Sequence, residues 1–197
     1  GFCAYGPHKG FFHKLVAYDN LITGLQYISS TLAGNPYTGN GRNLSYRKDL
    51  FFAHKGYYKS LSLHAGDDDL FINESATKQN TWVEYSPESI TEMAKIDRFS
   101  MWKEMKVSRA ATQRYYKGWN LTFFRMENLS YFLFFIAVIA SIVFGILGNW
   151  LISILAGLLY IIQFSSKAAI LHKSAKLQRT DIPADHLILI DQDIRAY

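Results

Sequence analysis

The longest apolar run in the sequence lies in its C-terminal third. From Leu129 to Ser166 there is no Asp, Glu, Lys, Arg or His. One straight helix over this run would be about 57 Å long, whereas the hydrocarbon core of a membrane is roughly 30 Å thick. A Gly-Asn-Trp turn at 148–150 divides the run into two helices, expected at 129–147 and 150–170. The pattern predicts a transmembrane hairpin, because too little chain remains to bury these helices in a soluble core.

Basic residues flank the apolar run on both sides, and the turn inside it carries no charge. By the positive-inside rule, both flanks stay in the cytoplasm. Aromatic residues gather between Tyr115 and Phe124, so residues 114–128 are expected to lie along the membrane surface. Residues 171–197 are expected to form a basic cytoplasmic tail. The flanking basic residues are Arg114, Lys117 and Arg125 before the hairpin, and Lys167, Lys173, Lys176 and Arg179 after it.

The first 113 residues predict a mixed α/β domain. Apolar residues recur at intervals of three and four from Leu15 to Leu32, which predicts a helix ended by Gly34. Three adjacent carboxylates at 67–69 favour a helix N-terminus, where they complement the helix dipole. The remaining expected elements are strands at 43–46 and 81–86, a short helix at 47–54 closed by Gly56, a capping box of Ser89 with Glu92, and a long basic helix at 97–117.

The overall composition excludes several classes of protein. With 49% hydrophobic and 16% aromatic residues, the chain is not intrinsically disordered. Its single cysteine, Cys3, excludes an intramolecular disulfide framework and a cysteine-based zinc site. The net charge of +5 is modest, and nucleic acid is not an expected partner. The sequence begins with Gly1 and shows no signal peptide, so we expect it to be a piece of a longer protein.

Asp67, Asp68 and Asp69 form the first candidate site. Adjacent carboxylates repel one another, so at least one is expected to have a raised pKa and to act as a base near neutral pH. The three side chains can equally hold a divalent cation through their oxygens. A solvated helix cap is the interpretation without chemistry, and the residues by themselves leave all three open.

A glycine-rich turn, Gly41-Arg42-Asn43, is the second candidate site. Its backbone N–H groups and its guanidinium can bind a phosphate or sugar hydroxyls. A plain turn before a strand explains the same residues.

The basic helix at 97–117 is the third candidate site. Lys106 and Arg109 lie three residues apart on one face and can clasp a diphosphate. Trp102, one turn before Lys106, offers a flat apolar face on which a sugar ring can stack. Attraction of the whole helix to anionic lipid is the alternative, worth about 1 kcal/mol per basic residue near the membrane surface.

Taken in order, these features resemble the C-terminal half of the membrane-bound family 2 glycosyltransferases. The segments that carry the likeness are Gly41–Lys48, Gly66–Asn73 and Trp82–Ser89, followed by the basic helix and the apolar hairpin. The likeness spans residues 10–165 and is closest to bacterial members of unassigned substrate. It implies the C-terminal part of a GT-A-like α/β domain joined to transmembrane helices, in the bacterial inner membrane with its catalytic part facing the cytoplasm.

The resemblance also implies a reaction, the inverting transfer of a sugar from a nucleotide-sugar to a hydroxyl of a cell-envelope glycan or a lipid-linked sugar. Asp68 takes the place of the family's general base, with Asp67 and Asp69 beside it. The turn at 41–43 matches the acceptor-side loop of the family. The basic helix stands where relatives carry the QxxRW motif, which contacts the diphosphate and the acceptor sugar.

The basic helix departs from that motif. When it is aligned through Lys106, the motif's Gln, Arg and Trp become Met105, Ser108 and Arg109. A single sugar transfer is therefore expected rather than processive synthesis. The family's donor half, with a DxD motif that binds Mg²⁺ or Mn²⁺, normally precedes this region, so the segment alone is not expected to bind the cation or to transfer sugar.

Two other classes of function fit parts of the pattern. One is a membrane-anchored interaction module without catalysis, in which the carboxylates cap a helix and the basic helix binds lipid. The other is a metal-dependent phosphoesterase with Asp67, Asp68 and Asp69 as cation ligands, for which His64 and its neighbours offer only a poor further ligand. The glycosyltransferase prediction accounts for the order of all the features together.

Overall fold

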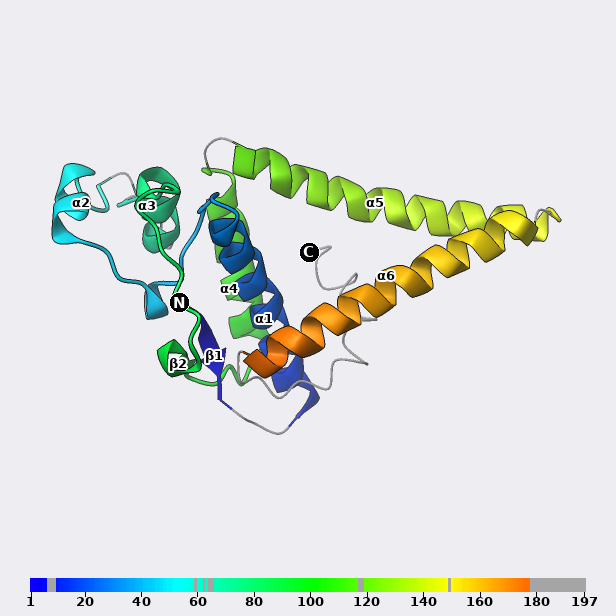
Figure 1. Ribbon diagram of the computed structural model, residues 1–197, viewed down its shortest axis with the longest axis horizontal. Coiled ribbons are helices and arrows are strands. Elements are labelled where there is room, and N and C mark those ends of the chain that lie inside the picture. The colour runs from blue at the N-terminus through cyan, green and yellow to red at the C-terminus, as the bar shows by residue number, and fades with distance from the viewer. Residues whose placement is uncertain are drawn as a thin grey trace. The chain divides into compact units, whose positions relative to one another are not determined.

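The computed structural model describes residues 1–6, 10–58, 60–61, 63, 66–116, 119–148 and 150–177. The chain divides into two compact units, one built on Gly1–Leu121 and the other on Thr122–Lys173. Unit 1 holds the candidate site residues, and unit 2 holds most of the apolar hairpin. Figure 1 shows the elements of both units along the chain.

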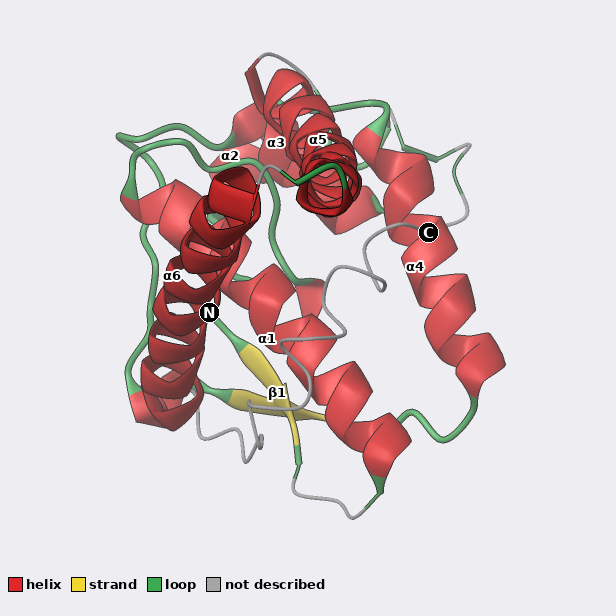
Figure 2. Cartoon of the chain, turned by 90° about the vertical axis from the view of Figure 1, so that its right-hand side faces the viewer, coloured by secondary structure: helices red, strands yellow, loops and turns green. Residues whose placement is uncertain are grey.

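Unit 1 is mostly helical and contains a small parallel sheet. Strand β1 pairs with β2 in a parallel register that sets Cys3 opposite Thr91 and Tyr5 opposite Met93. Figure 2 shows these two strands in yellow beside α1. In chain order, unit 1 comprises β1 (Cys3–Tyr5), α1 (Phe11–Leu32), η1 (Gly41–Asn43), α2 (Lys48–Ala53), α3 (Asp67–Ser75), η2 (Pro87–Ser89), β2 (Thr91–Met93) and α4 (Phe99–Gln113).

The core of unit 1 forms where α1 packs on β1. Phe2, Tyr18 and Leu21 are almost completely buried there, and the Asn20 side chain donates a hydrogen bond to the Cys3 carbonyl at 2.8 Å. Gly24 permits this close packing, because a Cβ at that position would lie 2.3 Å from the Phe2 ring. The predicted helix is present, but Asn20 and Gly24, which contact Cys3 and Phe2, lie outside its predicted apolar stripe, and Leu32 of that stripe is 63% exposed.

The four predicted helices of unit 1 are confirmed, with small changes in their ends. The helix expected from Leu15 extends over Phe11–Leu32, and Gly34 follows it with a φ of +87°. The helix expected at 47–54 is α2, after which Gly56 has a φ of +57°. The acidic triplet opens α3, and the basic helix is α4, which ends before Lys117, a residue outside those described.

The predicted strands and capping box are corrected. Neither 43–46 nor 81–86 forms a strand, and the strand of this region is β2. The alternation at 81–86 covers no core, since Trp82 and Tyr85 are 89% and 67% exposed. Ser89 belongs to η2 and donates to the Ser86 carbonyl, while Glu92 lies in β2, so no helix begins between them. The α/β prediction is thus met only loosely, by a mostly helical unit with two short strands.

Unit 2 is an antiparallel helical hairpin of α5 (Trp119–Ile146) and α6 (Trp150–Leu177). The Ser153 hydroxyl donates to the Ser141 carbonyl at 2.8 Å, and the rings of Phe134 and Tyr160 lie 6.1 Å apart. Both contacts fit one register, because they lie two helical turns apart on each helix. Gly148, with a φ of +89°, supplies the turn that the sequence predicts.

One helix, Trp150–Lys176, is long and apolar enough to cross a membrane, and almost none of it is buried within the protein. The Phe132–Ile146 part of α5 is a shorter apolar helix among the described residues. A second span, the cytoplasmic orientation and the surface-lying segment remain predictions. The side chains of 119–125 and the tail from 178 onward lie outside the described residues.

Candidate functional site

Gly66 positions the acidic triplet against α4. It caps the N-terminus of α3 in the left-handed region, with a φ of +92°. A Cβ at this position would lie 2.1 Å from Cγ2 of Thr112. Only glycine combines this backbone conformation with so close an approach, so Gly66 fixes where the three carboxylates begin.

The structure brings the glycine-rich turn to the predicted base. The Gly41 N–H donates to Oδ2 of Asp68 at 2.5 Å, and the Asp69 N–H donates to Oδ1 of Asp68 at 3.0 Å. A Cβ on Gly41 would itself lie 2.5 Å from Oδ2. Each carboxylate oxygen keeps a further lone pair, so Asp68 can still accept a proton or a hydrogen bond from a ligand.

The other two residues of the turn bind it to the sheet. The Asn43 side chain donates to the carbonyls of Phe2 and Ser89, at 2.7 and 2.8 Å. The Arg42 guanidinium lies 3.0 Å from the sulfur of Met93. Asn43 therefore holds the turn in place rather than pointing at a ligand, whereas Arg42 is exposed at the edge of the site.

Asp69 is the carboxyl of the triplet whose pKa is raised. Burial is the main cause and raises the pKa to about 6, with smaller contributions from the charges of Asp68 and Asp67. The Thr38 hydroxyl donates to Asp69, and that hydrogen bond and the Arg109 charge oppose the rise. One carboxyl of the triplet therefore has a raised pKa, as predicted, but burial and not mutual repulsion is the main cause.

Arg109 of α4 acts electrostatically on Asp69. Its positive charge lowers the pKa of Asp69 and opposes the effect of burial on Tyr5, Tyr27 and Tyr116. Its guanidinium forms no hydrogen bond or ion pair with any residue of the described part of the chain. A half-buried cation held in this way can bind an anionic group placed beside the carboxylates.

Tyr116 belongs to this site and not to a membrane-facing cluster, which corrects the sequence prediction for it. Its side chain is 6% exposed and packs edge-on against Tyr37 in unit 1, with ring centres 6.0 Å apart. Burial, and then the charge of Asp69, raises its pKa. Sequence reasoning missed Thr38 as well, because nothing in the pattern links residues of the loop after α1 to the triplet.

Trp102 and Lys106, both predicted to bind a ligand, make contacts inside unit 1 instead of with the triplet. Both contact Asp19 of α1, which accepts from the Trp102 indole at 3.1 Å and from the Lys106 ammonium at 2.7 Å. Trp102 is 8% exposed, so its ring offers no open face for a sugar, and the Lys106 charge is already paired. This cluster joins α1 to α4 inside unit 1.

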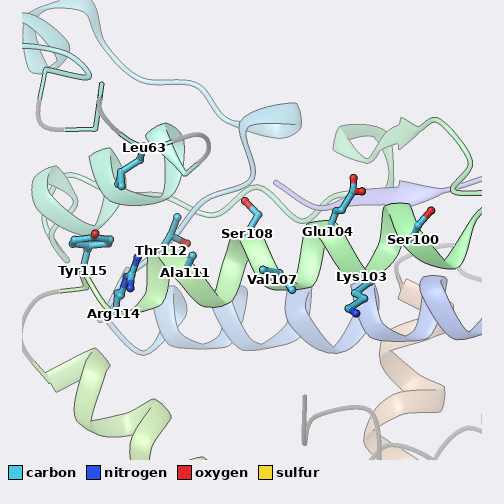
Figure 3. Close-up of a pocket in the computed structure, with 10 residues that line it drawn as sticks. All are labelled: Leu63, Ser100, Lys103, Glu104, Val107, Ser108, Ala111, Thr112, Arg114 and Tyr115. Carbon is cyan, nitrogen blue, oxygen red and sulfur yellow. The ribbon is translucent and has the colours of Figure 1, made fainter.

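The opposite face of α4 lines an open groove of about 490 Å³ (Figure 3). Val107 and Ala111 form part of its apolar wall, with Leu63 across from them. Thr112, whose Cγ2 lies against Gly66, also lines this groove. Its remaining lining residues are Ser100, Lys103, Glu104, Ser108, Arg114 and Tyr115.

Within the described ranges, no group of three or more His, Cys, Asp or Glu side chains could hold a metal ion. Asp68 and Asp69 turn to different partners, Gly41 and Thr38, and so do not converge on one point.

No family model, curated protein or solved structure matches this chain.

Proposed function

We propose that the chain carries the acceptor-side and general-base part of a membrane-bound inverting glycosyltransferase. One observation supports this most directly, the 2.5 Å hydrogen bond from Gly41 to Asp68. It joins two segments 27 residues apart, the turn that the resemblance matches to the acceptor-side loop and the residue that it matches to the general base. Arg109 adds a cation whose charge acts on the neighbouring Asp69.

In the proposed reaction, Asp68 accepts the proton of an acceptor hydroxyl as that oxygen attacks the anomeric carbon of the donor sugar. The new C–O bond forms as the bond from the anomeric carbon to the diphosphate breaks, and the nucleoside diphosphate leaves. The Arg109 guanidinium offers a counter-charge to an anionic group next to Asp68. The divalent cation belongs to the donor side of the proposed site, outside this segment.

Asp69 is the competing candidate for the base. A base works best when its pKa lies near the working pH, and the pKa of Asp69 is raised to about 6. In favour of Asp68, its carboxylate accepts from the Gly41 N–H of the glycine-rich turn, whereas Asp69 turns to Thr38. Asp68 is therefore our proposed base, with Asp69 as a positioning residue.

The donor is proposed to be a nucleotide-sugar, and the acceptor a cell-envelope glycan or a lipid-linked sugar. The proposed location is the bacterial inner membrane, with unit 1 in the cytoplasm. The apolar α6 helix is consistent with a membrane enzyme.

The test is sugar transfer by the native protein in its source membranes, using Asp68→Asn with Asp67→Asn as the matched control. Loss of a general base costs about 10²- to 10⁴-fold in rate, whereas the control should stay within a few fold. A pH–rate profile separates the two candidate bases. An acid limb near pH 6 that disappears in Asp69→Asn would assign the base to Asp69 instead. An Asp68→Asn rate within about threefold of wild type would contradict the proposal.

A further inference from the structure

Large apolar side chains gather, exposed, around the short helix α2. Phe52, Tyr58 and Leu61 are 73%, 70% and 74% exposed, and all three belong to residues 46–61, here named the α2 segment. Single exposed apolar residues are ordinary on a protein surface, but a gathered set marks a surface that meets an apolar partner.

An aromatic layer underlies part of the α2 segment, and Phe52 packs edge-on against Phe51 with ring centres 5.7 Å apart. Tyr46 stacks on Phe51 with ring centres 5.5 Å apart, and the hydroxyls of Tyr46 and Tyr57 lie 2.6 Å apart. Phe51 in turn packs on Phe71 of α3, at 5.5 Å. The exposed residues are therefore carried by a segment that is itself anchored to unit 1, as an interaction surface requires.

The α2 segment is also positively charged. Lys48 and Lys55 are exposed and form no ion pair with any described residue. Asp49, the single acidic residue of 46–61, is already held by Arg47. The segment thus combines exposed aromatic and aliphatic side chains with uncompensated lysines.

Lys55 occupies an unusual backbone conformation. Its φ of +60° lies in the left-handed region, and among the described residues no other non-glycine residue has a positive φ. This conformation costs a residue with a Cβ about 1 kcal/mol or more in conformational free energy, and it is usually adopted by glycine or asparagine. Lys55 and Gly56 together end α2 in this conformation.

We propose that the α2 segment docks on an anionic membrane surface. Phe52, Tyr58 and Leu61 enter the headgroup layer, while Lys48 and Lys55 face lipid phosphates. Aromatic and basic side chains together are the combination that interfacial segments use. Lipid is an available partner, because the same chain carries α6, which is long and apolar enough to cross a membrane. The docking stands whether or not the protein transfers sugars.

The α2 segment is a lipid contact in addition to the basic helix α4. Lys106 of α4 is paired with Asp19 and is not free to meet lipid phosphates, whereas Lys48 and Lys55 are. Arg98, Lys103 and Arg114 near α4 are exposed as well.

The test uses the full chain, one copy per nanodisc, with Cys3→Ser as the background. A spin label at Phe52→Cys or Tyr58→Cys reports depth through its relative collisions with oxygen and a nickel complex. Both labels should lie at headgroup depth in discs that contain phosphatidylglycerol, and a label at Gln79→Cys, an exposed polar position, should stay in water. Labels at 52 and 58 that are as solvated as the label at 79 would overturn the proposal.

The second part of the experiment removes the lysine charges of the α2 segment. Lys48→Gln and Lys55→Gln should each lower the ratio of docked to undocked segment about fivefold, and roughly 30-fold together. Lys78→Gln, at another exposed lysine of unit 1, is the matched control and should change nothing. Equal docking in pure phosphatidylcholine, or the loss of the depth signal in the control as well, would contradict an electrostatic contact with lipid. Depth that appears only in discs with two copies would assign the surface to self-association instead.

Discussion

Asp19 shows what one residue can and cannot reveal in a sequence. An aspartate inside an apolar helical stripe is a signal of a buried charge, and such a charge needs partners. Its two partners, Trp102 and Lys106, lie 83 and 87 residues further along the sequence. The sequence pattern therefore identified the helix but assigned both partners to ligand binding.

Breaking this cluster should cost stability. Asp19→Asn leaves the Lys106 ammonium without a counter-charge, and we expect the free energy of unfolding to fall by about 3 kcal/mol. The matched control is Asp49→Asn, which breaks the exposed Arg47–Asp49 pair and should cost less than about 0.5 kcal/mol. Unfolding of the chain in detergent, followed by tryptophan fluorescence, measures both. Equal losses would show that the Asp19 cluster is no more than a surface pair.

Asp69 should make the stability of unit 1 depend on pH. Its folded pKa of about 6 lies above the ordinary value of 3.8, so its contribution to stability is fully present below about pH 4 and is lost as the pH rises through 6. Asp69→Asn keeps an oxygen for Thr38 and should raise the free energy of unfolding by about 2 kcal/mol at pH 8, with no gain at pH 4. Thermal unfolding at the two pH values measures the difference. The same change at both pH values would contradict the assignment.

At the scale of elements, long periodic segments were predictable and short paired ones were not. Many apolar positions at helical spacing predict α1, and the carboxylates at its start predict α3. The strand β2 has only three residues, and it forms because β1, 88 positions earlier in register, supplies its partner. Thr81–Ser86 alternates more clearly, yet it buries no face and stays extended without a partner.

The contact between α3 and α4 should depend on Gly66. Gly66→Ala adds a methyl group 2.1 Å from Cγ2 of Thr112 at a φ of +92°, and we expect a loss of about 2 kcal/mol or more in the free energy of unfolding. Gly10→Ala is the matched control for the backbone cost alone, because its φ is +123° and nothing lies within 4 Å.

Thr112→Ser, which removes Cγ2, should restore part of the stability lost in Gly66→Ala. Chemical unfolding of the single and double variants gives the coupling between the two positions. Strictly additive losses would contradict the close packing of these helices.

At the scale of the whole molecule, the hairpin was predictable because a long run without charged residues can be read directly from the sequence, with no knowledge of tertiary contacts. The site was predictable only in part. The triplet, the turn and Arg109 were named from the sequence and meet in unit 1, whereas Thr38 and Tyr116 join them through folding alone.

The hairpin register should be visible by cross-linking in membranes. Ser141→Cys with Ser153→Cys, in the Cys3→Ser background, should form a disulfide on mild oxidation, because the Ser153 side chain reaches the Ser141 carbonyl. Ser141→Cys with Leu155→Cys is the control, since residue 155 lies two positions further on α6 and faces elsewhere. Gel mobility under non-reducing conditions measures both pairs. Comparable cross-linking of the two pairs would contradict the register.

The burial of Cys3 makes the reactivity of its thiol a probe of local opening in unit 1. It is the single cysteine of the chain, it lies in β1, and it is 1% exposed. A thiol reacts only when it meets reagent as a thiolate, so its modification must wait until β1 leaves the core. The rate at which a thiol reagent labels the native protein is therefore a measure of how often the sheet of unit 1 opens.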